Sequence, residues 1–314
     1  MGPDVMDIPT VHPNALRRGD AIGVVAPAGP VDKRDNFEAG LATLERLGFR
    51  VRYDERIFHT LRYLAGDDAE RAEEIHKYFE DPEIRAVLGL RGGFGSSRLI
   101  PLLDEHRLRQ RCKLFMGFSD LTTLHLYFRR RFGWVTLHGP MMTSESLARI
   151  SPDAEQHLLS LWTDPSYLPR FDIAGLEAWS AGAAEGVLTG GCLSLVVASL
   201  GTPYEIKTEG KVLFLEDFGE EPYRLDRMLT HLKLAGKLER IAGILLGSFE
   251  NCERENGEYT VAETLREVLG GLEVPILAKF PAGHGRENWP IPLGVKVRLD
   301  SAQSSVEFLE PAVV

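Results

Sequence analysis

Residues 114–131, LFMGFSDLTTLHLYFRRR, decide the fold class. An apolar run of strand length at 114–116 passes through a tight turn at 117–119 into a helical pattern at 120–131. A serine on a strand-to-helix turn lies exposed at the end of a sheet, where the free N–H groups of the helix favour developing negative charge. Ser before Asp is also a common helix-capping pair, so this stretch alone leaves Ser119 either a nucleophile or an N-cap.

On both sides of this stretch, apolar runs alternate with amphipathic helical patterns. Residues 22–26 and 86–90 have the composition of buried strands, and residues 37–47 and 68–79 have helical spacing. This alternation predicts an α/β fold with a mostly parallel sheet covered by helices. Ligands of such sheets bind beyond the carboxyl ends of the strands, which here means after Leu90 and after Met116.

The length of 314 residues indicates two domains. We expect a flexible tail at residues 1–14 and an N-terminal α/β domain at 15–150 that carries Ser119. Prolines and glycines gather in 151–184, which we interpret as the inter-domain linker. Residues 185–314 form the predicted C-terminal mixed α/β domain, which ends in a hairpin pattern.

Composition and charge exclude several classes of protein. The net charge is −10 and no dense run of Lys and Arg occurs that would mark a nucleic-acid-binding face. The three cysteines, Cys112, Cys192 and Cys252, are far apart and form no C-x-x-C pair, which argues against a disulfide framework or a zinc site. The start of the chain lacks a signal-peptide pattern, and the longest apolar runs are too short to cross a bilayer. These features predict a cytoplasmic protein without a membrane partner.

The glycine-rich stretch Arg91-Gly92-Gly93-Phe94-Gly95 follows the run 86–90. Three glycines let backbone N–H groups approach a ligand closely and form an anion-binding nest. Such a loop supplies one oxyanion donor, and the N–H of Asp120, directly after Ser119, supplies the other. The spacing fits neither a P-loop nor the dinucleotide fingerprint, and a simple tight turn remains the alternative.

A histidine and a glutamate in the second half are candidates for the remaining catalytic groups. His284 lies between Gly283 and Gly285, on backbone that substrate can approach, which suits a general base. His138 is the second candidate base. Glu216 follows the apolar run 212–215, where a carboxylate can be fixed so that it orients a histidine. A surface histidine and a solvated acidic loop are the alternatives, and the absence of a histidine near Glu216 argues against a metal site.

These stretches together resemble the LD-carboxypeptidase family of serine peptidases, over about residues 15–310. The matching segments are LRRGD (16–20), YLAG (63–66), ER (70–71), RGGFG (91–95), GFSDLT (117–122), HGPM (138–141), GG (190–191), GTPY (201–204), LED (215–217), YRLDRML (223–229) and GHG (283–285). Two positions depart from the family pattern. Cys192 stands where the family often has Asn, and Ala28 stands where it often has Ser.

The resemblance implies an N-terminal flavodoxin-like parallel-sheet domain and a C-terminal swivelling β/β/α domain, usually in a homodimer. It implies a triad of Ser119 as nucleophile, His284 as base and Glu216 as its orienter, with no metal and no cofactor. The oxyanion donors would be the N–H groups of Asp120 and of the Gly92-Gly93 loop. The implied reaction releases terminal D-Ala from a murein tetrapeptide through an acyl-enzyme, after either diaminopimelate or lysine.

Substrate contacts are less defined than the triad. A carboxypeptidase must bind a free carboxylate, and an arginine can hold it through two hydrogen bonds. The candidates are Arg91, Arg98, Arg224 and Arg286, and Phe94 is a further predicted contact. Two other functions stay open: a microcin-immunity-type peptidase that cleaves a peptide–nucleotide toxin, and a non-catalytic murein-peptide binding protein. Cys192 is predicted to be a small buried side chain and not a rival nucleophile.

Overall fold

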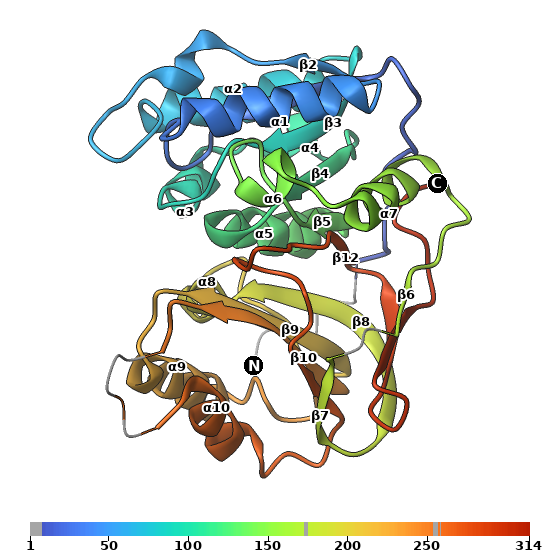
Figure 1. Ribbon diagram of the computed structural model, residues 1–314. Helices are drawn as coiled ribbons and strands as arrows, with labels where there is room; N and C mark the ends of the chain where they lie inside the picture. The colour runs from blue at the N-terminus through green and yellow to red at the C-terminus, as the bar shows by residue number, and fades with distance from the viewer. Residues whose placement is uncertain (1–7, 173–174, 254–256, 258) are drawn as a thin grey trace.

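Two β-sheets, one above the other in Figure 1, organise the chain into a first and a second lobe. The computed structural model describes residues 8–172, 175–253, 257 and 259–314. Over those residues the first sheet has the strand order β12-β5-β4-β3-β1-β2, and the second has the order β6-β14-β13-β8-β9-β10-β11-β7.

The strands of the first sheet are β1 (Ala21–Val25), β2 (Arg50–Arg52), β3 (Ile84–Gly89), β4 (Leu114–Gly117), β5 (Thr136–His138) and β12 (Ile291–Leu293). Those of the second sheet are β6 (Arg170–Phe171), β7 (Glu177–Ser180), β8 (Ala183–Cys192), β9 (Lys211–Phe218), β10 (Gly243–Glu250), β11 (Ile276–Ala278), β13 (Lys296–Asp300) and β14 (Ser305–Phe308).

The longer helices are α1 (Arg34–Arg46), α2 (Asp68–Glu80), α5 (Thr122–Phe132), α7 (Pro152–Thr163), α8 (Leu193–Ala198), α9 (Pro222–Leu234) and α10 (Val261–Leu269). Single turns are α3 (Ser96–Leu99), α4 (Glu105–Leu108), α6 (Glu145–Ala148) and the 3₁₀ segments η1 (Glu55–Phe58), η2 (Ile100–Leu102) and η3 (Ser119–Leu121).

The first sheet is parallel from β2 through β5, and its order 2-1-3-4-5 is that of flavodoxin-like folds. All five residues of β1 are buried, as expected for a strand covered by helices on both faces. Ile22 and Val24 pack in the core that includes Phe37 of α1, whereas Val25 packs in the core that includes Phe79 of α2. The predicted fold class is therefore confirmed, and the predicted strand-turn-helix at 114–131 lies at the centre of this sheet.

The second sheet has a parallel centre, β8-β9-β10-β11, with antiparallel strands on both sides. Along β9, Leu213 and Leu215 face the core beneath α9 and α10, whereas Val212 and Phe214 face the opposite core. Because side chains alternate along a strand, Glu216 continues the row of Phe214 and Asp217 continues the row of Leu215. The predicted mixed α/β domain with antiparallel elements is what the second lobe shows.

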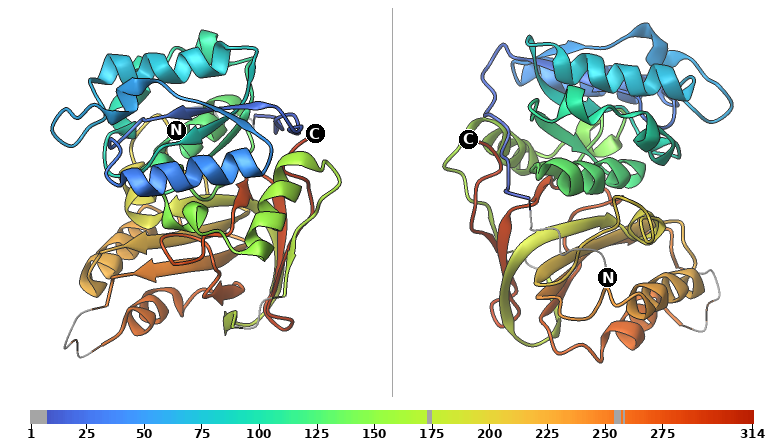
Figure 2. Two further views of the ribbon diagram at one scale, coloured as in Figure 1. Left: turned by 45° about the horizontal axis from the view of Figure 1, so that its top comes forward. Right: turned by 180° about the vertical axis from the view of Figure 1, so that it is seen from behind.

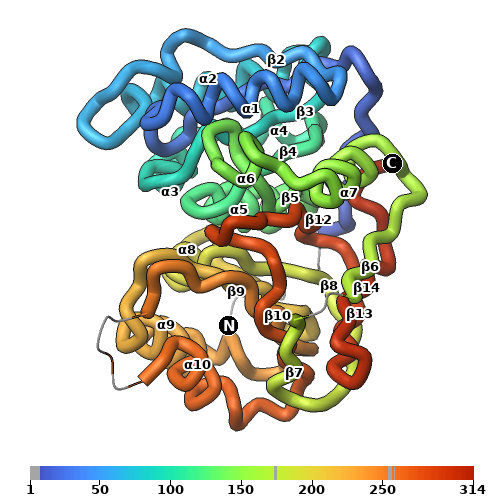
Figure 3. Tube along the Cα trace, viewed as in Figure 1, coloured from blue at the N-terminus to red at the C-terminus, as the bar shows by residue number. Residues whose placement is uncertain are grey.

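The chain crosses between the lobes more than once (Figure 3). Helix α7, within the predicted linker 151–184, packs Trp162 in a core of the first lobe. Strand β12 returns from the second lobe and pairs antiparallel with β5 of the first sheet. The end of the chain also returns, since the N–H of Val314 donates to the carbonyl of Pro13 at 2.9 Å. Part of the region 185–314 thus completes the first lobe.

The predicted tail 1–14 lies partly outside the described residues, which begin at Ile8. Its described part is hydrogen-bonded, because the N–H of Val11 donates to the carbonyl of Gly133 at 2.9 Å.

Strand β8 runs along the side of the second lobe that faces the first lobe, as Figures 1 and 2 show. It meets the start of α5, where the N–H of Cys192 donates to Thr122 Oγ1 at 3.1 Å.

Candidate active site

Ser119 lies on the turn between β4 and α5 with φ of 59°, in the left-handed region that non-glycine residues rarely occupy. Two glycines make room for this turn. A Cβ added at Gly89 or Gly117 would lie 2.2 or 2.4 Å from Leu121 Cδ2. The absence of a side chain at Gly89 of β3 and Gly117 of β4 therefore lets Leu121 pack tightly against both strands. A strained serine on such a turn is the geometry of a nucleophile elbow.

Gly92 lies directly against this serine. A Cβ added to Gly92 would lie 2.7 Å from Ser119 Oγ and 3.5 Å from the amide nitrogen of Asp120. Only a residue without a side chain allows this approach. The structure thus brings together Gly92, Ser119 and the N–H of Asp120, three of the predicted participants. Gly93 is exposed, with φ of 114°, and lies next to Gly29.

A carboxylate in the second lobe holds His284. The Nδ1–H of His284 donates to Glu216 Oε2 at 2.7 Å, and Glu216 is fully buried. Since the carboxylate only accepts, it fixes the tautomer of the neutral ring with the proton on Nδ1. Nε2 is then the unprotonated nitrogen, which can accept a proton. The pair links residues 68 positions apart in the sequence. Glu216 lies near the carboxyl end of β9, and His284 lies in the loop between β11 and β12.

The two glycines beside His284 are each held by a neighbouring side chain. The N–H of Gly283 donates to Asn288 Oδ1, and the N–H of Gly285 donates to Ser248 Oγ, both at 3.0 Å. A Cβ at Gly283 would come within 2.6 Å of Glu216 Oε2. Glycine at 283 thus makes the approach of the loop to the carboxylate possible. Asn288 and Ser248 were not predicted, because no local pattern marks them.

Phe118 connects the two lobes at this point. Its ring centroid lies 4.8 Å from that of His284, in an edge-to-face arrangement, and Phe118 directly precedes Ser119. Phe218 lies near His284 as well, with centroids 5.2 Å apart. The histidine side chain is 16% exposed, so it is enclosed by aromatic rings yet open to solvent at one edge.

The charge of Glu216 decides the protonation of His284. Burial by itself lowers the pKa of His284, but the hydrogen bond and the negative charge of Glu216 outweigh it, so the pKa is raised above 6.5. Burial raises the pKa of Glu216, and the histidine opposes that rise. A buried carboxylate bonded to Nδ1 is the arrangement that stabilises an imidazolium.

The other two histidines near the site are closed to solvent. His138, the second candidate base, is fully buried between Phe118 and Phe214, and burial holds its pKa well below 6.5. Burial lowers the pKa of His125 to about 4, so its ring is neutral at pH 7. Its Nε2–H donates to the carbonyl of Gly117 at 2.9 Å, and its Nδ1 accepts from the hydroxyl of Thr136 at 2.8 Å. Of these three histidines, only His284 has a surface that substrate can reach.

Cys192 has the environment of a structural thiol. It is 3% exposed, its Sγ lies 3.1 Å from Ser194 Oγ, and burial raises its pKa well above 9. The thiolate form that would attack a carbonyl is therefore disfavoured at neutral pH. The adjacent Asp217 accepts from the N–H of Ser194 at 2.8 Å and so anchors the start of α8.

The predicted substrate arginines lie in different surroundings. Arg91 pairs with Asp32 at 2.8 Å, and Arg224 contacts Tyr223 and Glu220 on the exposed side of α9. Arg98 pairs with Asp68, and the exposed Phe94 lies beside Tyr63 with ring centroids 6.0 Å apart. Arg286 differs, because within the part of the chain that the structure describes it forms no ion pair.

Arg286 lines a cleft of about 470 Å³ between the lobes. The cleft is lined by Glu145, Ser146, Arg149, Ser151, Ala154, Arg286, Glu287 and Asn288. Arg149 in this cleft is already paired with Glu145 at 2.9 Å. The cleft reaches the catalytic loop through Asn288, which bonds Gly283.

Among the described residues, no group of three or more His, Cys, Asp or Glu side chains could hold a metal ion. Within the same residues, no helix is both long and apolar enough to span a membrane.

Comparisons with known proteins show the family of this chain. A family model described as the LD-carboxypeptidase N-terminal domain matches residues 22–139, and one described as the LD-carboxypeptidase C-terminal domain matches 185–299. The chain is 38% identical to the "Probable murein peptide carboxypeptidase" of Bacillus subtilis, over 93% of this chain and 92% of that one. It is 34% identical to the murein tetrapeptide carboxypeptidase of Pseudomonas aeruginosa, over 86% of this chain and 90% of that one.

Solved structures show the same architecture. The muramoyltetrapeptide carboxypeptidase from Oxalobacter formigenes has a TM-score of 0.79 and 28% identity, over 92% of this chain and 97% of that one. The microcin C7 self-immunity protein MccF in complex with aspartyl sulfamoyl adenosine has a TM-score of 0.91, over 97% and 100% of the two chains, and at 24% identity it shows the fold alone. The family models and the named relatives define a carboxypeptidase of the hydrolase class. The chain belongs to the LD-carboxypeptidase family.

Proposed function

We propose that this protein is a serine-type LD-carboxypeptidase that releases the terminal D-Ala of a murein tetrapeptide. The observation that carries the proposal is the His284–Glu216 pair packed on Phe118, next to a serine in a strained turn. The names of the Bacillus and Pseudomonas relatives support the murein peptide as substrate. The catalytic residues are Ser119, His284 and Glu216.

In the proposed reaction, these groups act in sequence. As Ser119 Oγ attacks the carbonyl carbon before D-Ala, Nε2 of His284 takes the hydroxyl proton and Glu216 stabilises the imidazolium. The N–H groups of Asp120 and of the Gly92-Gly93 loop hold the oxyanion. The imidazolium then gives its proton to the amine of D-Ala as the C–N bond breaks. Water, deprotonated by Nε2, cleaves the remaining ester, and Ser119 regains its proton.

Replacing Ser119 by alanine tests the proposal. We expect wild type to remove one alanine from murein tetrapeptide and Ser119→Ala to leave the peptide intact, as read by mass spectrometry. A triad member typically contributes a factor of about 10⁴–10⁶ to kcat, so the loss will be complete on the time scale of the assay.

The other outcomes each reject a part of the proposal. Cleavage by both proteins would show that Ser119 is not the nucleophile. Binding of the peptide without cleavage by wild type would favour a binding protein. If wild type spares the peptide but cleaves an aminoacyl-sulfamoyl adenosine, the protein acts as a microcin-immunity-type peptidase.

Arg286 is our candidate for the residue that binds the free carboxylate of the substrate. It lines the inter-lobe cleft two residues after His284, and it has no carboxylate partner among the described residues. Arg286→Ala should raise KM about 10- to 100-fold, because a charge-assisted hydrogen bond contributes about 1.5–3 kcal/mol. Arg149→Ala is the matched control, since that arginine lies in the same cleft but is paired with Glu145. Equal values of KM for the wild type and Arg286→Ala would exclude this role.

The contacts of Arg91, Arg224 and Phe94 with substrate, the homodimer and the cytoplasmic location stay predictions from the sequence. Measuring kcat/KM for tetrapeptides with diaminopimelate and with lysine as the third residue would show which of the two substrates the protein prefers.

A further inference from the structure

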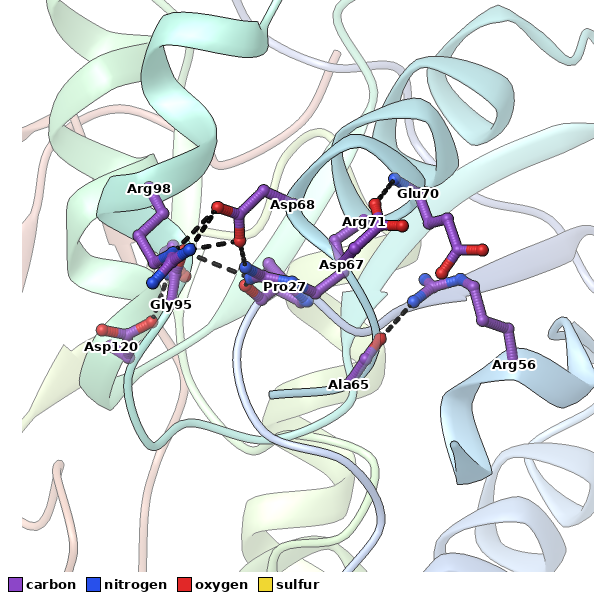
Figure 4. A network of polar contacts seen from close by, with 11 residues as sticks. Pro27, Arg56, Ala65, Asp67, Asp68, Glu70, Arg71, Gly95, Arg98 and Asp120 are labelled. Atoms are coloured by element: carbon purple, nitrogen blue, oxygen red, sulfur yellow. Dashed lines mark hydrogen bonds and ion pairs between the residues drawn. The ribbon is translucent and has the colours of Figure 1, made fainter. Parts of the chain in front are cut away.

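Helix α2 carries a buried arginine that the proposed mechanism does not use. Arg71 is fully buried, although Glu70 and Glu73 on the same helix are exposed. Its Nη1 donates to the carbonyl of Pro27 and to that of Gly95, the latter at 3.2 Å, and its Nη2 donates to Asp68 (Figure 4). One guanidinium thus bonds two backbone carbonyls and a carboxylate.

The two carbonyls belong to different loops at the edge of the sheet where substrate is expected. Pro27 follows β1 and Gly95 ends the glycine-rich loop that follows β3, and these strands are neighbours in the sheet. A second bond joins the same loops, from the N–H of Gly29 to the carbonyl of Gly92 at 3.2 Å. Because Gly92 lies against Ser119, the position of this loop sets the position of a predicted oxyanion donor.

The contact between Arg71 and the glycine-rich loop depends on the absence of a side chain at Gly95. A Cβ at Gly95 would lie 2.7 Å from Arg71 Nη1 and 3.1 Å from the carbonyl oxygen of Pro27, and its φ of 150° disfavours any side chain. A planar guanidinium has five N–H donors in a fixed geometry, enough for both carbonyls and Asp68, whereas a neutral amide has two N–H donors and a methionine side chain has none.

Asp120, the residue after Ser119, belongs to the same network of polar contacts. Asp120 is 1% exposed, and its Oδ2 accepts from the N–H of Ser96, directly after the glycine-rich loop, at 2.8 Å. The charge of Arg71 attracts that of Asp120, which compensates part of the cost of burying this carboxylate. Arg71 therefore acts on both sides of the predicted oxyanion site, on the loop through Gly95 and on the nucleophile turn through Asp120.

Helix α2 holds the loop after β1 at a second point, besides the bond from Arg71 to Pro27. Glu74, one turn after Arg71 and 5% exposed, accepts from the N–H of Ala26 at 2.7 Å. Its Oε2 also pairs with Arg56 at 2.5 Å. The loop after β1 is thus bonded to α2 at consecutive residues, which gives the bond between Gly29 and Gly92 a rigid support.

We propose that Arg71 is a positioning residue for the reaction, which holds the loop 91–95 so that its N–H groups point at the oxyanion. The proposal rests on the proposed function of Ser119. Arg98 offers a matched control. Its Nε and Nη2 both bond the same carboxylate, Asp68, the latter at 2.6 Å, and its side chain is 38% exposed. Because Asp68 occupies this guanidinium, Arg98 is no longer our candidate for binding the substrate carboxylate, and among the described residues its side chain donates to neither of the two loop carbonyls that Arg71 binds.

The test compares Arg71→Met with Arg98→Met. Arg71→Met should lower kcat by about 10²–10³-fold, as the loss of one oxyanion donor does, with KM changed by less than about threefold. Arg98→Met should change neither constant by more than about threefold. Arg98 remains beside Asp68 in Arg71→Met, so Asp68 keeps an ion-pair partner in that variant.

A conservative variant and a second measurement keep the test decisive. Arg71→Lys keeps the positive charge but not the planar guanidinium with its several N–H donors, and should recover part of the lost kcat. It also replaces Arg71→Met in the test if Arg71→Met does not fold. Hydrogen exchange of the full-length protein should be faster at 91–96 in Arg71→Met and unchanged there in Arg98→Met. Wild-type kcat in a folded Arg71→Met or Arg71→Lys would overturn the proposal.

The failure of this inference is distinguishable from that of the proposed function. If wild type does not cleave murein tetrapeptide, the proposed function is wrong, and the exchange measurement then decides whether Arg71 holds the loop. Unchanged exchange at 91–96 in Arg71→Met would overturn the inference by itself.

Discussion

Glu216→Gln lowers kcat for murein tetrapeptide about 10³–10⁴-fold and moves the acidic limb of the pH profile to lower pH. The side-chain amide keeps the size of the carboxylate but removes the charge that stabilises the imidazolium. In a serine protease, the same exchange at the third triad residue costs about 10⁴ in kcat, because the histidine is left in the wrong tautomer. The Nδ1–H bond of 2.7 Å to Glu216 Oε2 makes the same dependence expected here.

The direction of the pH shift follows from the pKa of His284. The base works only when neutral, and Glu216 raises its pKa above 6.5, so the acidic limb of kcat/KM in wild type lies above pH 6.5. Without the negative charge, burial dominates and lowers the pKa of His284, so the limb moves to lower pH. The profile is measured between pH 4.5 and 9 with folded protein.

Asp217→Asn is the control for this prediction. It also removes a negative charge near His284, but its carboxylate bonds the N–H of Ser194 and not the histidine. We expect a small shift of the limb in the same direction and a kcat within about tenfold of wild type. An unchanged limb in Glu216→Gln would mean that this carboxylate does not control the histidine.

The sequence predicts the framework of the first lobe well because its signals are local. Apolar runs of strand length and turn glycines lie within a few residues of each other, so the strand-turn-helix at 114–131 and the parallel sheet follow from short-range patterns. Strand β12 does not follow from them. It has three residues, and its pairing with β5 depends on the return of the chain from the second lobe.

The site is predicted less completely, and for a physical reason. The pattern of 68–79 predicts a charged, amphipathic helix, whose charged side chains are expected in solvent. Arg71 and Glu74 are nevertheless buried, because two loop backbones supply hydrogen-bond partners for them. Glu216 and His284 were open to other interpretations from local sequence. Their meeting depends on how β9 and the loop after β11 lie side by side, and the resemblance alone suggested the pairing.

Gly92→Ala should lower kcat about 10³-fold in a protein that still folds. The added Cβ would lie 2.7 Å from Ser119 Oγ and 2.8 Å from Ser119 Cβ, so the loop or the serine must move. The φ of Gly92 lies outside the left-handed region, so alanine adds crowding without backbone strain. A shift of this loop displaces an oxyanion donor, whose loss costs about 10²–10³ in kcat, and a displaced nucleophile adds to it.

Gly271→Ala is the matched control, because a Cβ there has no atom within 4 Å and the φ of Gly271 also lies outside the left-handed region. It should keep both kcat and the free energy of unfolding of wild type. Wild-type kcat in Gly92→Ala would show that Gly92 does not lie against the nucleophile.

A double-mutant cycle separates contact with Ser119 from a general effect on the loop. Overpacking of this kind costs about 1–3 kcal/mol in the free energy of unfolding. Ser119→Ala removes Oγ, the nearer of the two crowded atoms, so Gly92→Ala should destabilise that background less than wild type. Urea unfolding of the four proteins gives the coupling energy, expected at about 0.5–3 kcal/mol for residues in contact. A coupling of zero would place the glycine-rich loop away from the serine hydroxyl, and both oxyanion donors would then have to come from the nucleophile turn.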